Sequence, residues 1–397
     1  MKPTAILDIG TSKIVCLCGS MLDRDGIVVH GAGISACNCF IGDTFSDLHG
    51  LHSAIVEAVQ KAEQEARTRI RDVALTVPIS FSKLILSDMT MTLGERKRIV
   101  QPEDVDRLIE ASYRKANAPK GYVLMHSTPV FYLVDGYSST EVPQGVPCEE
   151  LSGLISHMFV KEEFINTIQD ALDDIGVEIS MCIAAPLGEA TMLIPENERV
   201  RPAVLIDVGY RHTDLAVVEG SALTAISCIP VGGAQFASDL SFGLDVTLES
   251  AEQAKRRFVF SLDYQNKTEI LRSETQSKRV SNSTIAYIVE ARATELANLI
   301  HEALERMSVN LEAKPVVYLS GGGLLMMRGS LEFLKKALNL PIKRDMPWTP
   351  RLSSPNYCSA FGALNFVLKA NRDAEEQTQT EPDEDSFLQK LKDFFTK

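Results

Sequence analysis

The chain has 397 residues, of which 45% are hydrophobic and 23% are charged, and this composition is typical of a folded globular protein. The length is sufficient for two or more domains, each with its own hydrophobic core. A net charge of -13, with no compensating stripe of Lys and Arg, argues against a nucleic-acid partner, because neutralising phosphates requires clustered cations.

The cysteines and the apolar runs bear on where the protein resides. Most of the eight cysteines lie in apolar runs and none has the spacing of a zinc site, so buried reduced thiols are expected. Reduced thiols are typical of a cytoplasmic protein. The sequence shows neither the pattern of a secretory leader nor an apolar run of the roughly 20 residues that span a bilayer.

Two stretches, residues 4–18 and 203–218, share one pattern. Each is an apolar strand that ends in Asp-x-Gly, turns over a few residues and returns as a second apolar strand. Asp8 and Gly10 stand in the first stretch, and Asp207 and Gly209 stand in the second. A single hairpin of this kind is most often ordinary turn chemistry. The pair is a much stronger signal than either half.

The residues of the first turn suit a phosphate group. Gly10 permits a tight turn, Thr11 and Ser12 carry hydroxyl groups, and Lys13 adds a positive charge. The aspartate that ends the strand before each turn suits a hydrated Mg²⁺ ion. Two such hairpins therefore predict a site for a nucleoside triphosphate and its metal between two domains.

The two halves of the chain follow the same plan. The first hairpin continues into a third strand at 26–34 and a helix whose start signal is Thr44, or Ser46 and Asp47, and a buried strand at 73–78 closes the unit. The second hairpin has its own third strand at 222–230, which runs into a helix. This strand-strand-strand-helix plan indicates an internal duplication.

Residues 81–159 interrupt the first half. Two alternating strands, 84–91 and 122–133, flank a helix that begins at Pro102, and a turn-rich segment at 135–147 leads out. We expect a small inserted α+β subdomain. Its short basic run, 95–98, predicts a solvated loop.

Later segments add further small-residue turns. Gly232 and Gly233 precede a helix whose free N–H groups suit a phosphate. Glu252 and Lys255 lie one helical turn apart, a spacing that an exposed ion pair explains equally well. An apolar strand is then followed by three glycines, 321–323, in a turn where the backbone can approach a flat ring closely.

Other helices are expected at 161–175, 187–194, 288–307, 329–338 and 356–364, with a strand at 179–185.

The last residues of the sequence, 371–397, differ in composition from the rest of the chain. Residues 371–385 are acidic and nearly free of apolar side chains, which predicts a disordered linker. Residues 386–397 have the pattern of an amphipathic helix that is too short to span a bilayer and suited to lying in its surface. The alternative is a helix that docks back onto the protein. The apolar stripe and its flanking lysines are Phe387, Leu388, Leu391, Phe394 and Phe395 with Lys390 and Lys392.

These motifs, in this order, are similar to those of the FtsA family, the bacterial actin-like cell-division proteins of the actin, Hsp70 and sugar-kinase superfamily. The resemblance covers nearly the whole chain, and the matching segments are 8–13, 207–209 with Thr213, 229–233, 251–255, 288–292 and 319–323. It implies an α/β architecture: a duplicated actin-like (ribonuclease H-like) ATPase fold with an inserted α+β subdomain and a C-terminal amphipathic helix.

The resemblance also implies the ligands, ATP and Mg²⁺, and the residues that hold them. No catalytic residue is assigned, so the protein is expected to be at most a slow ATPase. The turn residues Tyr210, Arg211 and His212 depart from the small residues that many superfamily members have there. The implied phosphate-binding residues are Gly10, Thr11, Ser12, Lys13, Gly209, Thr213, Gly232 and Gly233. Those implied near the ribose and base are Glu252, Lys255, Gly321, Gly322, Gly323 and Leu324, and those implied to hold Mg²⁺ through water are Asp8 and Asp207.

The expected domains are as follows. Residues 1–80, 160–198 and 356–370 form the first actin-like core, 81–159 the inserted interaction subdomain, 199–230 and 308–355 the second core, 231–307 a lid, 371–385 the linker and 386–397 the membrane-targeting helix.

The implied function is to self-associate and to tether the tubulin-like division ring to the inner face of the cytoplasmic membrane, recruiting later division proteins. One alternative is a small-metabolite kinase of the same superfamily, which would need a general base beside an acceptor hydroxyl. The other is an actin-like platform for pilus or secretion assembly, for which the tail has no obvious role.

Overall fold

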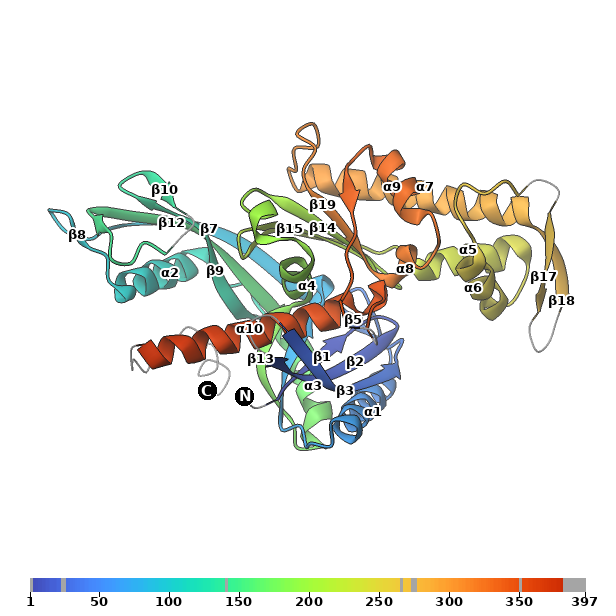
Figure 1. Ribbon diagram of the computed structural model, residues 1–397, viewed down its shortest axis with the longest axis horizontal. Helices are drawn as coiled ribbons and strands as arrows, with labels where there is room; N and C mark the ends of the chain where they lie inside the picture. Colours follow the sequence, from blue (N-terminus) through green and yellow to red (C-terminus); the bar gives the residue numbers. More distant parts are fainter. Residues whose placement is uncertain are drawn as a thin grey trace. The chain divides into compact units, whose positions relative to one another are not determined.

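A computed structural model describes residues 3–22, 26–139, 142–264, 267–272, 277–349 and 352–380 (Figure 1). Membrane contact is predicted for tail residues between 387 and 395. These residues lie outside the part of the chain that the structure describes. These described residues form two compact units. The first comprises those of Met1–Pro202, Val217–Ile226 and Ala360–Lys397, and the second comprises those of Ala203–Ala216 and Ser227–Ser359.

The first unit is built on a five-stranded sheet with the order β13-β6-β1-β2-β3. β1, β2 and β3, the predicted hairpin and its third strand, form an antiparallel meander, and β6 and β13 continue the sheet beyond β1 as parallel strands. Parallel pairing brings the carboxyl ends of β1 and β6 to the same edge. The strands are β1 (Thr4–Ile9), β2 (Lys13–Leu22), β3 (Gly26–Ala36), β6 (Asp72–Val77) and β13 (Glu178–Ala184), with a short pair, β4 (Phe40–Ile41) and β5 (Thr44–Phe45).

The first helix begins where the sequence predicts. The Asp47 carboxylate accepts a hydrogen bond from the Gly50 N–H at 2.8 Å and so caps the N-terminus of α1. One face of this helix is buried, as its periodicity predicts. The helices of the unit are α1 (Leu48–Ala66), α3 (Glu162–Asp173), α4 (Ala185–Leu193) and most of α10 (Cys358–Thr380), with short 3-10 turns at Ile79–Phe81 and Glu196–Glu198.

The insertion is a four-stranded sheet with the order β10-β9-β12-β7 and one helix beside it. The sequence predicts two of these strands and the helix, but it misses β12, the long strand that pairs with both β7 and β9. Gly153, Ser152 and Ser156 interrupt the apolar pattern of β12, which hides the strand from a periodicity argument. The elements are β7 (Ser82–Thr92), β8 (Arg98–Ile99), α2 (Pro102–Ala116), β9 (Tyr122–Val134), β10 (Tyr137–Ser139), β11 (Pro147–Cys148) and β12 (Glu150–Lys161).

The second sheet repeats the first. Its order, β16-β15-β14-β19-β20, matches β3-β2-β1-β6-β13 strand for strand, with β19 parallel to both β14 and β20. This match confirms the predicted duplication. The strands are β14 (Ala203–Val208), β15 (Thr213–Glu219), β16 (Ala222–Ile229), β19 (Val317–Ser320) and β20 (Ile342–Lys343).

The second unit also carries helices and a small hairpin. α7 begins at Asn282, six residues earlier than its sequence pattern predicts, directly after β18. The remaining elements are α5 (Gly233–Leu244), α6 (Leu248–Arg257), β17 (Thr268–Arg272), β18 (Ser277–Ser281), α7 (Asn282–Arg306), α8 (Gly322–Leu325), α9 (Ser330–Leu338) and a 3-10 turn at Pro355–Tyr357.

The predicted linker is wrong over its first part. Helix α10 continues through Thr380, so residues 371–380 are helical. An established helix extends at low cost through Ala, Glu and Gln, and no Gly or Pro intervenes before Pro382. The absence of apolar side chains removes a reason for packing but does not end a helix.

One expectation about the cysteines is also wrong. Cys37 and Cys39 form a disulfide, whereas reduced thiols were expected throughout. Their Cα atoms lie 5.4 Å apart, within the range that a disulfide requires. The other six cysteines are free thiols.

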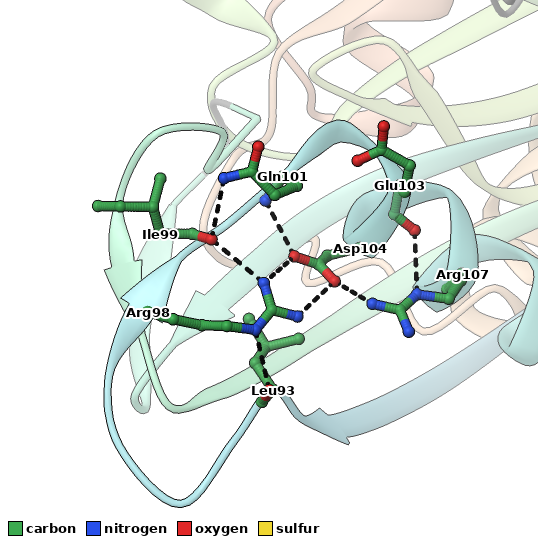
Figure 2. A network of polar contacts seen from close by, with 7 residues as sticks. All are labelled: Leu93, Arg98, Ile99, Gln101, Glu103, Asp104 and Arg107. Atoms are coloured by element: carbon green, nitrogen blue, oxygen red, sulfur yellow. Dashed lines mark hydrogen bonds and ion pairs between the residues drawn. The ribbon is translucent and has the colours of Figure 1, made fainter.

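A charged network fastens the loop of the insertion to the start of α2 (Figure 2). Arg98 donates to both carboxylate oxygens of Asp104, at 2.6 and 2.7 Å, and its Nε donates to the Leu93 carbonyl at 2.9 Å. The Gln101 N–H donates to the same carboxylate at 2.9 Å, and Arg107 pairs with it from the next turn of the helix. Asp104 is buried, and the bonds from Arg98 above all hold the pKa of its carboxyl well below the usual range. Arg98 at the end of the basic run is half-buried in this network, whereas Glu95, Arg96 and Lys97 are exposed, as the predicted solvated loop requires.

Replacing Asp104 with Asn should weaken this part of the insertion by about 2 kcal/mol. The change leaves Arg98 without its anionic partner. The expected loss of stability is smaller than for a fully buried ion pair because the side chains of Arg98 and Arg107 both reach solvent. The pKa of Asp104 is lower in the folded protein than in the unfolded chain, where it is about 3.9. Its carboxylate therefore contributes fully to folding stability above that pH, and this contribution is lost as the pH falls further. The difference between wild type and variant should therefore narrow below about pH 4.

Hydrogen-exchange mass spectrometry over residues 93–116 measures this effect. Glu110→Gln, which removes an exposed ion pair with Arg114 on the same helix, is the matched control and should change protection little. Equal protection in Asp104→Asn and Glu110→Gln at pH 7 would contradict the structural role of Asp104.

Candidate nucleotide site

The first hairpin turns over Gly10, Thr11, Ser12 and Lys13. The Gly10 N–H donates to the Lys13 carbonyl at 3.1 Å. On either side of this turn β1 and β2 pair without interruption, from Ile9 opposite Ile14 to Thr4 opposite Gly19. A side chain at Gly10 would meet the Lys13 carbonyl at 2.9 Å, so the turn requires glycine. The turn thus holds the predicted phosphate-binding residues together at the end of β1.

Asp8 is positioned by a residue that the sequence analysis does not single out. The Thr76 hydroxyl, on the parallel strand β6, donates to the Asp8 carboxylate at 2.7 Å and accepts from the Ile9 N–H at 3.3 Å. Thr76 is fully buried. A polar residue near the end of an otherwise apolar parallel strand was the signal that could have identified it.

The second hairpin closes in the same way. The Gly209 N–H donates to the His212 carbonyl at 2.9 Å, as the Gly10 N–H does to Lys13. His212 is therefore the counterpart of Lys13, and Thr213 is the counterpart of Ile14. Thr213 is fully buried and donates its hydroxyl proton to the Val231 carbonyl at 2.7 Å. The structure thus gives the Thr213 hydroxyl a protein acceptor.

His212 lies in a charged environment. Its Nε2 atom is 3.3 Å from a carboxylate oxygen of Asp214, and both side chains are largely buried. Burial lowers the pKa of His212, but the carboxylates of Asp214 and Asp207 raise it by more, so its pKa lies above the usual value. The second hairpin thus favours a cation at the position where the first has a lysine.

Asp207 and Ser320 repeat the arrangement of Asp8 and Thr76. Ser320 is fully buried and pairs with Asp207 in the parallel register of β14 and β19. Gly321 follows with a φ of 86°, and a side chain there would lie 2.1 Å from the Asp207 carboxylate. Glycine is required because the chain leaves β19 against this aspartate.

The glycines of the second unit bring three backbone segments into direct contact. A side chain at Gly323 would lie 2.0 Å from the Gly209 carbonyl, and one at Gly233 would lie 2.8 Å from the Gly323 Cα atom. The hairpin turn, the start of α5 and the start of α8 therefore touch without intervening side chains. Protein backbone fills the Cβ directions of these glycines.

The expected free N–H groups at the start of α5 are engaged. The Gly232 N–H donates to the side chain of Gln235 at 2.9 Å, and the Gly233 N–H donates to the Gly209 carbonyl at 2.9 Å. The next N–H, of Ala234, donates to the Tyr210 carbonyl at 2.6 Å. The prediction that these donors are free to bind phosphate is wrong, because the helix start uses them to hold the hairpin turn.

Lys255 and Glu252 meet the same cluster. Lys255 is buried, and its ammonium group lies 2.6 Å from the Glu252 carboxylate and donates to the Gly233 carbonyl at 3.0 Å. Burial lowers the pKa of Lys255 below its usual value despite the opposing effect of Glu252. The two residues therefore form the ion pair that the alternative interpretation of this spacing predicts, but the pair is largely buried instead of exposed.

The triple-glycine turn becomes the short helix α8. Gly322 approaches Asn356, whose Cβ atom would lie 2.8 Å from an added side chain, and Leu324 is buried in the core. Asn356 is a further neighbour that sequence reasoning did not single out.

The structure therefore gathers the predicted residues into two sets. The first unit holds Asp8 with Gly10–Lys13, and the second holds Asp207, Gly209, Gly232, Gly233, Glu252, Lys255 and Gly321–Leu324. Among the described residues, no group of three or more His, Cys, Asp and Glu side chains is arranged to hold a metal ion. No helix in those same ranges has the length and apolar character needed to cross a bilayer.

Replacing Gly323 with Ala should destabilise the second unit by about 3 kcal/mol, because the new Cβ atom meets rigid backbone. Thermal unfolding followed through the single tryptophan, Trp348, measures this change. Gly220→Ala is the control: it has a φ of 58° and no heavy atom within 4 Å, and it should cost about 1 kcal/mol in backbone strain alone. Equal losses in the two variants would contradict the packing role of Gly323.

Two family models match this chain. The model described as cell division protein FtsA matches residues 204–362, and the model described as SHS2 domain inserted in FTSA matches residues 83–156. The chain belongs to the FtsA family. It is 26% identical to cell division protein FtsA of Neisseria meningitidis, over 92% of this chain and 90% of that protein. It is 22% identical to cell division protein FtsA of Escherichia coli K12, over 98% of this chain and 97% of that protein.

Solved structures agree on the fold. The PilM-PilN type IV pilus biogenesis complex aligns with a TM-score of 0.63 at 18% identity, over 92% of this chain and 98% of that one. MreB5 of Spiroplasma citri bound to ADP aligns with a TM-score of 0.55 at 13% identity, over 94% and 99%. At these identities the likeness concerns the fold alone, and it confirms the actin-like architecture of this FtsA-family chain.

Proposed function

We propose that this protein is an ATP-binding, actin-like cell-division protein that self-associates and tethers the tubulin-like division ring to the inner face of the cytoplasmic membrane. Its membership of the FtsA family, together with two hairpins built alike in the two units, is the observation that carries the proposal. The protein would act as a peripheral membrane protein at the division site and recruit later division proteins there.

The residues of the two units fit a nucleotide with its metal. Thr11, Ser12 and Lys13 offer hydroxyl groups and a cation to phosphate oxygens at a turn that glycine makes possible. Asp8 is held in place by the Thr76 hydroxyl, Asp207 lies opposite Ser320 on the neighbouring parallel strand, and both aspartates would bind Mg²⁺ through water. Bound Mg²⁺ would neutralise phosphate charge. Glu252 and Lys255 would lie near the ribose and adenine, with Gly321–Leu324 beneath the base.

ATP would serve mainly as a structural and regulatory ligand. A ligand that binds the folded protein stabilises it in proportion to the logarithm of its concentration over its dissociation constant. Because no residue is assigned to activate water, hydrolysis would be slow at most. The solved MreB5 structures hold ADP or AMPPNP, which supports a nucleotide in this fold.

Replacing Lys13 with Ala should weaken ATP binding about tenfold and leave adenosine binding unchanged, because a charge-assisted hydrogen bond to phosphate is lost. Isothermal titration calorimetry of the full chain with each ligand measures both affinities. Lys61→Ala, which removes an exposed lysine paired with Glu57 on α1, is the control. Unchanged ATP affinity in Lys13→Ala would show that the first hairpin does not bind phosphate.

The insertion is suited to contacting other proteins. It has a hydrophobic core of its own, composed of Val100, Val105, Leu108, Tyr132, Cys148 and Leu151. Its outer strands leave apolar side chains exposed, among them Ile99 and Tyr137. A module with its own hydrophobic core and exposed apolar groups would supply the surface for later division proteins.

The tail would bind lipid. Its apolar stripe and lysines suit the surface of an anionic membrane, and one helix of this size binds reversibly. Self-association would place many tails on one surface and strengthen binding by avidity. Because α10 reaches Thr380, the acidic stretch before Ser386 would be shorter than the sequence suggests.

Truncation after Thr380 should abolish co-sedimentation with anionic liposomes, and Phe394→Asp should reduce it strongly, because a charged residue cannot enter the apolar layer. Gln389→Ala, which lies off the apolar stripe, is the matched control and should pellet like the wild type. Equal pelleting of the intact and truncated proteins would refute the membrane anchor.

A further inference from the structure

We propose that Cys37 and Cys39 form a reversible disulfide that controls how firmly the first hairpin turn, at residues 10–13, is held. The structure contains the oxidised form of the pair, and an external dithiol would open it. This inference rests on the proposed function, which places the protein on the cytoplasmic side of a membrane. Disulfides in that compartment are usually transient and redox-sensing instead of permanent.

The position of the pair gives the disulfide little weight in folding stability. Cys37 and Cys39 are two residues apart in the sequence and lie between β3 and β4, outside any helix or strand. Closing so short a loop restricts the unfolded chain only slightly. Both side chains are buried, but Ala36 and Asn38 beside them are exposed, so a local opening of this segment uncovers the sulfur atoms.

Backbone hydrogen bonds connect the pair to the hairpin turn. The Cys37 N–H donates to the Ser12 carbonyl at 3.1 Å, within the turn that would bind phosphate. On the other side, the Cys39 carbonyl accepts from the N–H groups of Ser46 and Asp47, at 2.7 and 3.3 Å. Asp47 is the N-cap of α1. The disulfide therefore fixes the chain between the turn and the start of the first helix.

The residue after the pair extends this connection to the insertion. Phe40 is fully buried, and its ring packs edge-on against Phe81 with 5.4 Å between the ring centroids. Phe81 directly precedes β7, the first strand of the insertion. Opening the disulfide releases the chain between the bond to Ser12 and the buried ring of Phe40, so the turn loses part of its support.

The other thiols are poor partners for exchange with this pair. All six are free, and five of them are buried. Burial raises the pKa of Cys182 to about 12 and also raises the pKa of Cys16, so these two thiols stay protonated at neutral pH. Because the thiolate is the form that attacks a disulfide, the pair exchanges with an external thiol and not with these two cysteines.

The reaction is a two-electron thiol–disulfide exchange. A thiolate of the dithiol attacks one sulfur atom, breaks the bond between Cys37 and Cys39 and forms a mixed disulfide. The second thiolate of the reagent then attacks its own sulfur in the mixed disulfide and releases the protein. The dithiol thus becomes a cyclic disulfide, and each cysteine gains one electron and one proton. A low-molecular-weight disulfide reverses the change and is reduced to two thiols.

Counting thiols in the full-length protein tests whether the pair is reversible. The protein is equilibrated in glutathione buffers of graded potential, alkylated under denaturing conditions and weighed by mass spectrometry. Six cysteines should be alkylated at oxidising potentials and eight at reducing ones, with one reversible two-electron midpoint. Eight alkylated cysteines at every potential, or six even in dithiothreitol, would overturn the inference.

Hydrogen-exchange mass spectrometry without nucleotide tests the effect on the turn. Protection over residues 10–13 and 37–47 should fall on reduction, because the bond from Cys37 to Ser12 is no longer held by the disulfide. Equal protection of the turn in the oxidised and reduced protein would overturn the inference.

Two serine variants serve as controls for the cysteine chemistry. The double variant Cys37→Ser, Cys39→Ser should resemble the reduced wild type in every buffer. Cys148→Ser is the matched control, since its hydroxyl can replace the thiol that donates to the Glu150 carbonyl, and it should keep the full redox response. A redox response that persists in the double variant would contradict the assignment to this pair.

Calorimetry in oxidising and reducing buffers tests the coupling to the ligand. ATP affinity should be about fivefold weaker in the reduced protein, as expected from weakening one hydrogen bond in the turn. Coupling is reciprocal, so saturating ATP should make the midpoint potential about 20 mV more negative. Equal ATP affinity in the two states would overturn the inference and leave the proposed function standing. Absence of ATP binding in both states would remove the proposed function, whereas the thiol counts and the hydrogen exchange would still decide the role of the disulfide.

Discussion

Direct backbone contact at Gly209, Gly233 and Gly323 is the constraint on which the second unit depends. The hairpin turn, the start of α5 and the start of α8 meet there, and each lacks the side chain that would separate it from its neighbour. At this contact the Gly233 N–H donates to the Gly209 carbonyl, and the Gly233 carbonyl accepts a hydrogen bond from Lys255. These glycines therefore act first through packing, and any ligand meets a surface whose shape they set.

The two units use one backbone plan with different side chains. In each, an aspartate ends the first strand of a hairpin and a hydroxyl residue on the adjacent parallel strand lies beside it, Thr76 in one and Ser320 in the other. In each, a glycine closes the turn by a bond to the third residue beyond it. The chemistry of the turn differs, because a lysine with a valine nearby is replaced by His212 with Asp214. Backbone hydrogen bonds tolerate this exchange because they do not involve the side chains.

The insertion shows how a small module maintains its shape. Its hydrophobic core lies between α2 and the sheet, and the loop that precedes α2 has few apolar residues of its own. Asp104 compensates by accepting bonds from Arg98, Arg107 and the backbone of Gln101. Four donors around one buried carboxylate fix a loop that apolar packing alone would leave loose.

The sequence by itself determined the local patterns: both Asp-x-Gly hairpins, the helix cap at Asp47, the insertion and the duplication. These depend on neighbouring residues, through alternation, turn chemistry and capping. Only the tertiary structure decided which residues meet, because strand register, packing against distant backbone and burial depend on segments far apart in the chain. It placed Thr76 against Asp8, set the backbone of Gly209 and Gly233 against Gly323, and extended α10 across the first part of an expected linker.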